Sequence, residues 1–116
     1  MYDILNRLNK TEGVRGSIVI GKDGLVIASD LGTDADENAV AAIGSQLLNS
    51  LQGALRRMGM GAFKRFVVTG KEGKIVLADA GSALLVVLLS LDANLGLAGV
   101  EIKAAIQEIQ RKVKML

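Results

Sequence analysis

Cysteine and histidine are both absent from this chain of 116 residues, and each absence removes a class of chemistry. Without cysteine there is no disulfide framework, no thiol nucleophile and no thiolate metal site. Without histidine the chain lacks the commonest general base, and a Ser-His-Asp arrangement is excluded. The remaining carboxylates, lysines and hydroxyls form no convergent set of acid, base and nucleophile, so we expect no enzyme and no cofactor.

Aromatic residues and long apolar runs are also scarce. Only 3% of the residues are aromatic, so the core must consist of Leu, Ile, Val and Ala, and few rings remain to stack on bases. The net charge of +2 is too small to indicate nucleic-acid binding. The longest apolar stretch, residues 83–91, is far shorter than the roughly 20 residues that span a bilayer. The N-terminus shows no signal-peptide pattern, so we expect a cytoplasmic protein without a membrane span.

The spacing of apolar residues predicts helices and strands in the order αββαβββα. Short turns bounded by glycine, such as 21–24 and 70–73, separate the strands. The predicted helices cover residues 2–12, residues 34–60 and a final segment that starts near Asp92 or Asn94. The predicted strands cover residues 17–20, 25–29, 63–69, 74–78 and 84–91.

The predicted helix over residues 34–60 is long for so small a protein, about 40 Å at 1.5 Å per residue. Asp34 or Asp36 is expected to cap its N-terminus. One apolar stripe follows the helical period, and it consists of Val40, Ile43, Leu47, Leu51, Ala54 and Met58, widened by Leu48 and Leu55. The opposite face carries small and polar residues.

The strand over residues 84–89 is apolar at every position, which predicts a place at the sheet centre with helices on both faces. Short turns impose antiparallel pairing within each hairpin. The continuously apolar strand 17–20 is the natural second neighbour of the central strand. The fold class is therefore α+β, with a five-stranded antiparallel sheet of order 2-1-5-4-3.

The strand over residues 63–69 is then an edge, and it offers unpaired backbone groups on a β-prone segment. Pairing of this strand with its own copy across a two-fold axis would satisfy the edge, with the two long helices side by side. The alternative is an edge that is simply tolerated, with the small helix residues facing water. The predicted dimer contacts are Ala42, Ser45, Asn49, Gly53, Phe66, Val67 and Val68.

The residues around the first hairpin resemble a known family. Residues 13–20 read GVRGSIVI and residues 23–29 read DGLVIAS, which is similar to the opening of the roadblock (dynein light-chain) family. Residues 94–97 and 101–103 resemble the junction before the last helix of that family. The resemblance implies a profilin-like fold, a single roadblock-type domain over residues 1–116, and dimers formed through the third strand and the long helix.

The resemblance also implies partnership with small Ras-like GTPases. In bacteria, Mgl-type polarity systems pair a dimeric roadblock protein with a GTPase and stimulate hydrolysis, whereas eukaryotic members occur in dynein and in lysosomal GTPase scaffolds. This chain carries no long terminal extension, which argues against any activity that depends on an extension, GTPase activation included. We therefore expect a homodimeric platform that binds and regulates a small GTPase. The predicted partner-binding residues are Gln52, Arg56 and Arg57. The alternative is a structural adaptor without preference for the nucleotide state.

Three local patterns favour simpler interpretations. Residues 16–22 have the spacing of a phosphate loop, but Asp23 follows where Ser or Thr is needed, so we expect a hairpin turn. The carboxylates of Asp34, Asp36 and Glu37 are expected to cap a helix rather than bind a metal. The basic residues Arg56, Arg57, Lys64 and Arg65 are either solvated charges at a helix end or a contact surface for a partner.

Overall fold

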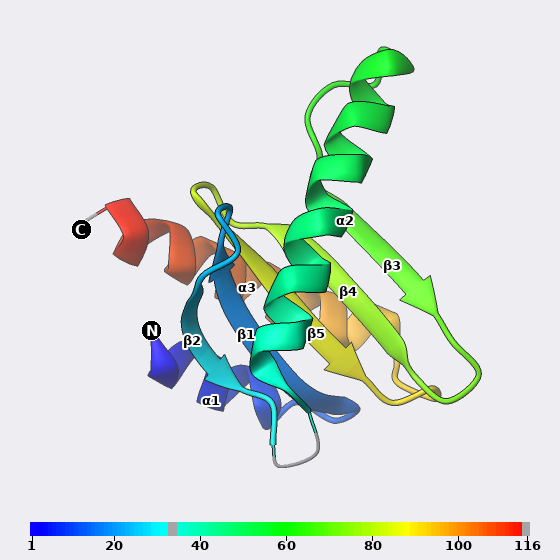
Figure 1. The fold of residues 1–116 in the computed structure, drawn as a ribbon. Helices are drawn as coiled ribbons and strands as arrows, with labels where there is room; N and C mark the ends of the chain where they lie inside the picture. Colours follow the sequence, from blue (N-terminus) through cyan, green and yellow to red (C-terminus); the bar gives the residue numbers. More distant parts are fainter. Residues whose placement is uncertain (33–34, 115–116) are drawn as a thin grey trace.

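The computed structural model describes residues 1–32 and 35–114, and the elements in them follow the predicted order αββαβββα (Figure 1). The helices are α1 (Tyr2–Asn9), α2 (Glu37–Arg57) and α3 (Leu95–Lys114). The strands are β1 (Val14–Gly21), β2 (Val26–Asp30), β3 (Arg65–Thr69), β4 (Lys74–Asp79) and β5 (Ala83–Leu89). The predicted fold class is therefore confirmed.

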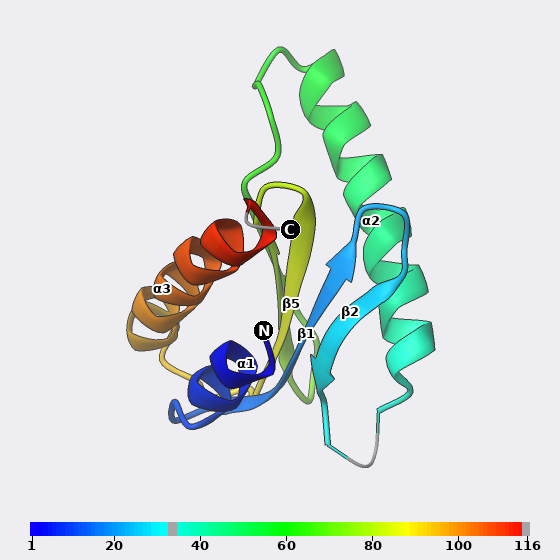
Figure 2. The same cartoon turned by 90° about the vertical axis from the view of Figure 1, so that its left-hand side faces the viewer.

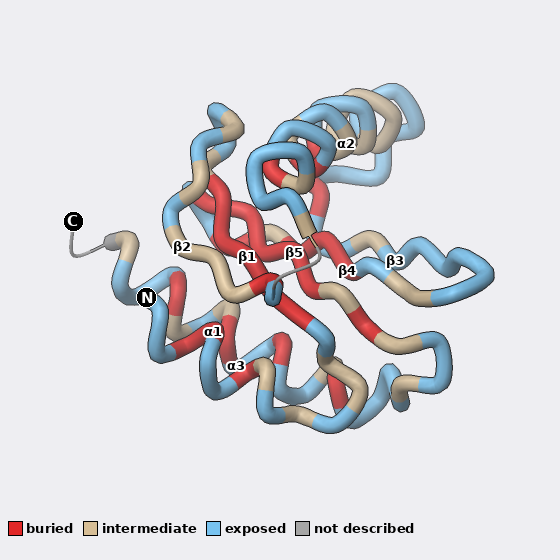
Figure 3. Tube along the Cα trace, turned by 60° about the horizontal axis from the view of Figure 1, so that its bottom comes forward, coloured by how far each residue is buried: buried red, intermediate tan, exposed pale blue. Residues whose placement is uncertain are grey.

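The five strands form one antiparallel sheet in the order β2-β1-β5-β4-β3, as the apolar pattern predicts. The central strand β5 pairs with β1 on one side and with β4 on the other. Figure 3 shows this centre as the most buried part of the molecule, while β3 is largely exposed. A strand without polar positions is stable here because both of its faces are covered.

The helices cover the two faces of the sheet unequally, as the edge-on view shows (Figure 2). Helices α1 and α3 pack on one face, where Leu85 and Val87 of β5 meet Ile102 and Ile109 of α3. Helix α2 lies alone on the other face, above Leu84 and Val86. Successive strand residues point to opposite faces, so β5 contributes to both cores.

Helix α2 is shorter at both ends than the predicted span 34–60. Asp36 caps it, because its carboxylate accepts hydrogen bonds from the backbone N–H groups of Asn38 (3.1 Å) and Ala39 (3.3 Å). The alternative cap, Asp34, lies outside the described residues. At the other end Gly59 adopts a positive φ of 69°, and the N–H of Met60 bonds back to the Leu55 carbonyl at 2.9 Å. This glycine-based cap terminates the helix.

Other boundaries also differ from the predicted ones for identifiable reasons. The third strand begins at Arg65 rather than at residue 63, and Phe63, which precedes it, packs in the core under α2. Helix α3 starts after Asn94, whose side chain accepts hydrogen bonds from the N–H groups of Gly96 (2.9 Å) and Leu97 (3.2 Å). The first helix ends at Asn9, and the strand predicted to reach residue 91 ends at Leu89.

Only the first half of α2 rests on the sheet. Its buried residues, Ala41, Gly44 and Leu48, all lie before residue 49, and a Cβ added at Gly44 would meet the Ile20 side chain at 3.1 Å. The second half projects beyond the ends of the strands (Figures 1 and 2). None of the helices within the described residues combines the length and the apolar character needed to cross a bilayer.

Candidate interaction surfaces

Strand β3 is an edge of the sheet, and within the described residues only β4 pairs with it. Its side chains alternate between the two faces. Phe66 stands opposite Leu77 and packs into the core under α2, whereas Val67 stands opposite Val76 on the face of α3. Val67 and Val68 are 40% and 38% exposed. The predicted edge strand is thus present, with apolar side chains beside its free backbone groups.

Helix α2 has two different flanks on either side of its buried face. On the flank near β2, the hydroxyl of Ser45 lies 3.5 Å from the Lys22 carbonyl in the β1–β2 turn. The helical period places Ile43, Leu47, Leu51, Ala54 and Met58 on the opposite flank, toward β3. Ile43 is 56% exposed and Met58 is 66% exposed. Two members of the predicted apolar stripe, Ile43 and Met58, are therefore exposed and belong to a free apolar flank of α2.

The small and polar residues predicted for the dimer lie elsewhere on α2. Ala42 and Asn49 are exposed, and Gly53 is half-buried with open space around its Cα. The 3.6-residue period places these residues on the outer surface of the helix and on the flank of Ser45, not on the flank toward β3. Their role in a dimer remains a prediction. The apolar flank of α2 lies nearer to the free edge of β3 than these residues do.

A groove of about 630 Å³ lies beside the start of α2, on the part of the sheet that this helix leaves uncovered. Its apolar side chains come from Leu31, Ala35, Val68, Ile75 and Leu88. Ile75 and Leu88 face each other in the β4–β5 register, and Val68 faces Ile75 across β3 and β4. The groove therefore continues directly to the free edge of β3. Sequence reasoning missed it, because it depends on where α2 crosses the sheet.

The predicted partner-binding residues gather at the end of α2. Arg56 and Arg57 are exposed in its last turn, and Gln52 is half-buried one turn earlier. Gln52, Arg56 and Phe63 line a shallow hollow under the loop over residues 59–62. Arg65 does not join this group, because its guanidinium is directed toward Gly99 of α3, on the other face of the sheet. The four basic residues that are close in sequence therefore do not form one surface, since Arg65 lies on the α3 face of the sheet.

The charges of the chain are distributed unevenly along the sequence. Residues 38–71 contain five basic residues and no acidic residue, although the whole chain contains fourteen basic and twelve acidic residues. This stretch forms nearly all of α2, the following loop and β3. Residues 38–71 therefore carry a net charge of +5, and the remaining residues, with nine basic and twelve acidic side chains, carry a net charge of −3.

The segment with phosphate-loop spacing forms a strand and a turn. Ile18, Val19 and Ile20 are fully buried in β1, so their backbone is committed to the sheet and cannot wrap a phosphate. Asp23 accepts a hydrogen bond from the Leu25 N–H within the turn. Of the carboxylates considered for a metal, Asp36 serves as a helix cap. Among the described residues, no three potential ligands from His, Cys, Asp and Glu lie close together.

The sequence of the chain is similar to a known domain family and to two archaeal proteins. A model of the Roadblock/LC7 domain matches residues 1–89, from α1 to the end of β5. Two uncharacterised proteins of Methanocaldococcus jannaschii are each 41% identical to the chain over 107 residues. The matched region covers 92% of this chain and 94% of each relative.

Solved structures share the whole architecture, α3 included. MglB of Myxococcus xanthus is similar with a TM-score of 0.93 and 22% identity, covering 99% of this chain and 95% of that one. A Roadblock/LC7 domain of Streptomyces avermitilis gives a TM-score of 0.91 at 20% identity, with 98% of both chains covered. A profilin of Acanthamoeba castellanii gives 0.69 at 14% identity, over 96% and 97% of the chains, which confirms the predicted profilin-like fold. On the match to the domain model and on the two close relatives, the chain belongs to the Roadblock/LC7 family.

Proposed function

We propose that the protein is a non-catalytic homodimer of one roadblock domain over residues 1–116, and that it binds and regulates a small Ras-like GTPase. The observation that carries the proposal is the adjacency of two unpartnered elements, the β3 edge and the apolar flank of α2. Both lie on the same side of the protomer. An exposed edge strand is a template for pairing with another chain, and a symmetric dimer uses the same patch on both copies.

Antiparallel pairing of β3 with its copy would continue the sheet from one protomer to the next. A two-fold axis at this edge brings the projecting half of each α2 over the part of the partner sheet that its own α2 leaves uncovered. That part is the groove lined by Val68, Ile75 and Leu88. The apolar side chains on the flank of α2 would then pack against the apolar side chains of this groove. The proposed dimer therefore covers both the groove and the apolar flank of α2.

The outer surface of the paired α2 helices is the proposed GTPase-binding surface. It carries no acidic residue after Glu37, and Arg56 and Arg57 stand at its end. The small residues Ala42 and Gly53 permit close approach of a flat partner surface. Membership of a family whose other members partner Ras-like GTPases supports this assignment, and the positive surface indicates an acidic contact on the GTPase.

Reversal of one charge at the end of α2 tests the assignment. We expect Arg57→Glu to weaken GTPase binding by about tenfold or more, because one attractive contact becomes repulsive. The measurement is a titration of purified Ras-like GTPases of the same organism, loaded with a GTP analogue or with GDP. The control is Lys103→Glu, an equal charge change at an exposed position of α3. Equal losses in both variants would contradict a specific role for the α2 surface.

The nucleotide dependence separates this function from the adaptor alternative. A regulator binds the GTP-loaded and GDP-loaded forms with different affinities, because only a differential affinity shifts an equilibrium between two states. An adaptor binds both forms equally. Absence of binding to any GTPase, with an intact dimer, would reject the regulatory function and retain the dimer.

A further inference from the structure

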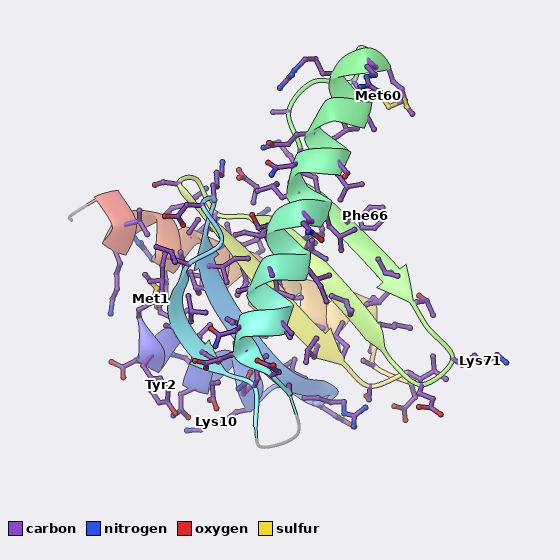
Figure 4. All side chains as sticks on the ribbon, viewed as in Figure 1. Met1, Tyr2, Lys10, Met60, Phe66 and Lys71 are labelled. Carbon is purple, nitrogen blue, oxygen red and sulfur yellow. The ribbon has the colours of Figure 1, made fainter. Side chains whose placement is uncertain are left out.

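The end of α2 and the loop after it form a narrow projection, which we call the α2 tip and define as residues 56–61. The tip stands clear of the sheet, and Met60 lies at its far end (Figure 4). Its backbone conformation is fixed by the hydrogen bonds from the N–H groups of Gly59 and Met60 to the carbonyls of Arg56 and Leu55. Gly59 and Gly61 both adopt positive φ angles and have open space around them.

Two large apolar side chains are exposed on this tip. Met58 is 66% exposed and Met60 is 69% exposed, which makes Met60 the most exposed large apolar residue found in the described chain. The loop over residues 59–62 folds back on the side of Gln52 and Arg56. In the proposed dimer the opposite flank of α2, which includes Met58, packs on the partner. Met60 therefore remains free in the dimer.

Three cations flank the exposed methionines along the chain. Arg56 and Arg57 precede them, Lys64 follows, and all three side chains are exposed. The nearest acidic residues along the chain are Glu37 and Glu72. The α2 tip thus carries two cations, Arg56 and Arg57, and no acidic residue. Lys64, just beyond the tip, lies beside Asp79, whose backbone N–H donates to the Lys64 carbonyl at 2.9 Å. Clusters of basic residues near a membrane are attracted to anionic lipids, and apolar side chains beside them enter the boundary between headgroups and acyl chains.

From these features we propose that the α2 tip docks on an anionic lipid surface, with the Met60 side chain inserted below the headgroups. A protein partner fits the tip less well, because a stable protein interface takes about 20–30 residues from each side. A lipid surface requires no extended complementary face, because binding to it adds a contribution from buried apolar area to the attraction between basic residues and anionic lipids. The proposal shares Arg56 and Arg57 with the proposed GTPase-binding surface, and Met60, which that surface does not include, distinguishes lipid docking from GTPase binding.

The absence of tryptophan from the chain permits a direct test by fluorescence. In the variant Met60→Trp, the single indole reports the polarity at the end of the tip. We expect its emission to shift to shorter wavelength with vesicles of equal parts phosphatidylglycerol and phosphatidylcholine, and not with phosphatidylcholine alone. The matched variant Leu97→Trp, at an α3 position that is 63% exposed, should show no shift. Vesicle binding without a shift at position 60 would overturn the proposal.

Co-sedimentation with the same vesicles tests the energetic contributions. We expect Met60→Ser to weaken binding by about fivefold or more, and the double variant Arg56→Gln with Arg57→Gln by at least about tenfold. Leu97→Ser should bind like the original protein. Light scattering on each variant establishes that the dimer is intact. Failure of the original protein to bind anionic vesicles would overturn the proposal, and saturable binding of the tip to an acidic protein instead would assign it to protein docking.

Discussion

The Val67→Lys variant is expected to be monomeric, with a molar mass near 12.1 kDa, whereas the proposed dimer of the original protein should show twice that mass. Val67 lies in the middle of the free edge strand and is 40% exposed, so a lysine is tolerated in the isolated protomer. Across a two-fold axis the substitution places two like charges beside each other in the new sheet. Opposed like charges and loss of water both penalise pairing, and we expect the Kd of the dimer to rise by about a thousandfold or more.

The matched control for this variant is Ile27→Lys on β2, the other edge of the same sheet. Ile27 is 45% exposed, so the two variants carry the same change at similar exposure. Sedimentation equilibrium over a range of concentrations gives the Kd of each. We expect Ile27→Lys to remain dimeric. A dimer that survives Val67→Lys and is lost in Ile27→Lys would place the interface at β2 and would contradict pairing through β3.

The second large effect is expected from Ile43→Glu, on the apolar flank of α2. Ile43 is 56% exposed in the protomer, so the substitution should leave the free energy of unfolding of the monomer nearly unchanged. In the proposed dimer the same position is covered by the partner, and a buried unpaired carboxylate is strongly unfavourable. We expect the Kd of the dimer to rise by about a hundredfold, measured by the same sedimentation experiment.

The neighbouring variant Ala42→Glu provides a sharp control, because Ala42 is one of the dimer contacts predicted from the sequence alone. The helical period directs these adjacent residues to different sides of α2. We expect Ala42→Glu to leave the dimer intact. If Ala42→Glu breaks the dimer and Ile43→Glu does not, the small-residue interface predicted from the sequence is right and the flank inferred from the structure is wrong.

The sequence predicts the order of elements and of strands because these depend on local patterns. The uninterrupted apolar run of β5 requires cover on both faces, and this requirement alone places it at the centre of the sheet. The turn glycines separate the strands clearly. Element ends are predicted less well, since they depend on single contacts such as the burial of Phe63 and the cap at Gly59.

The rotation of α2 could not be predicted in the same way. Its apolar stripe is wider than the face that rests on the sheet, and periodicity does not show which part of a wide stripe is buried. Packing resolves this: Leu48 is buried, whereas Ile43 is not. The groove beside α2 could not be predicted from the sequence either, because Leu31, Val68 and Leu88 come from three distant segments that only the fold brings together.

The most direct test of the edge-paired dimer is a distance measurement between spin labels, since the chain has no cysteine of its own. One label is attached through Val67→Cys on β3 and, in a second sample, through Ile27→Cys on β2. In a continuous sheet of two protomers, the two β3 strands are neighbours about 5 Å apart, whereas the β2 strands lie nine strand spacings apart, about 43 Å. We predict strong short-range coupling between the β3 labels and only weak long-range coupling between the β2 labels. Short-range coupling at β2, or none at either position, would contradict the account.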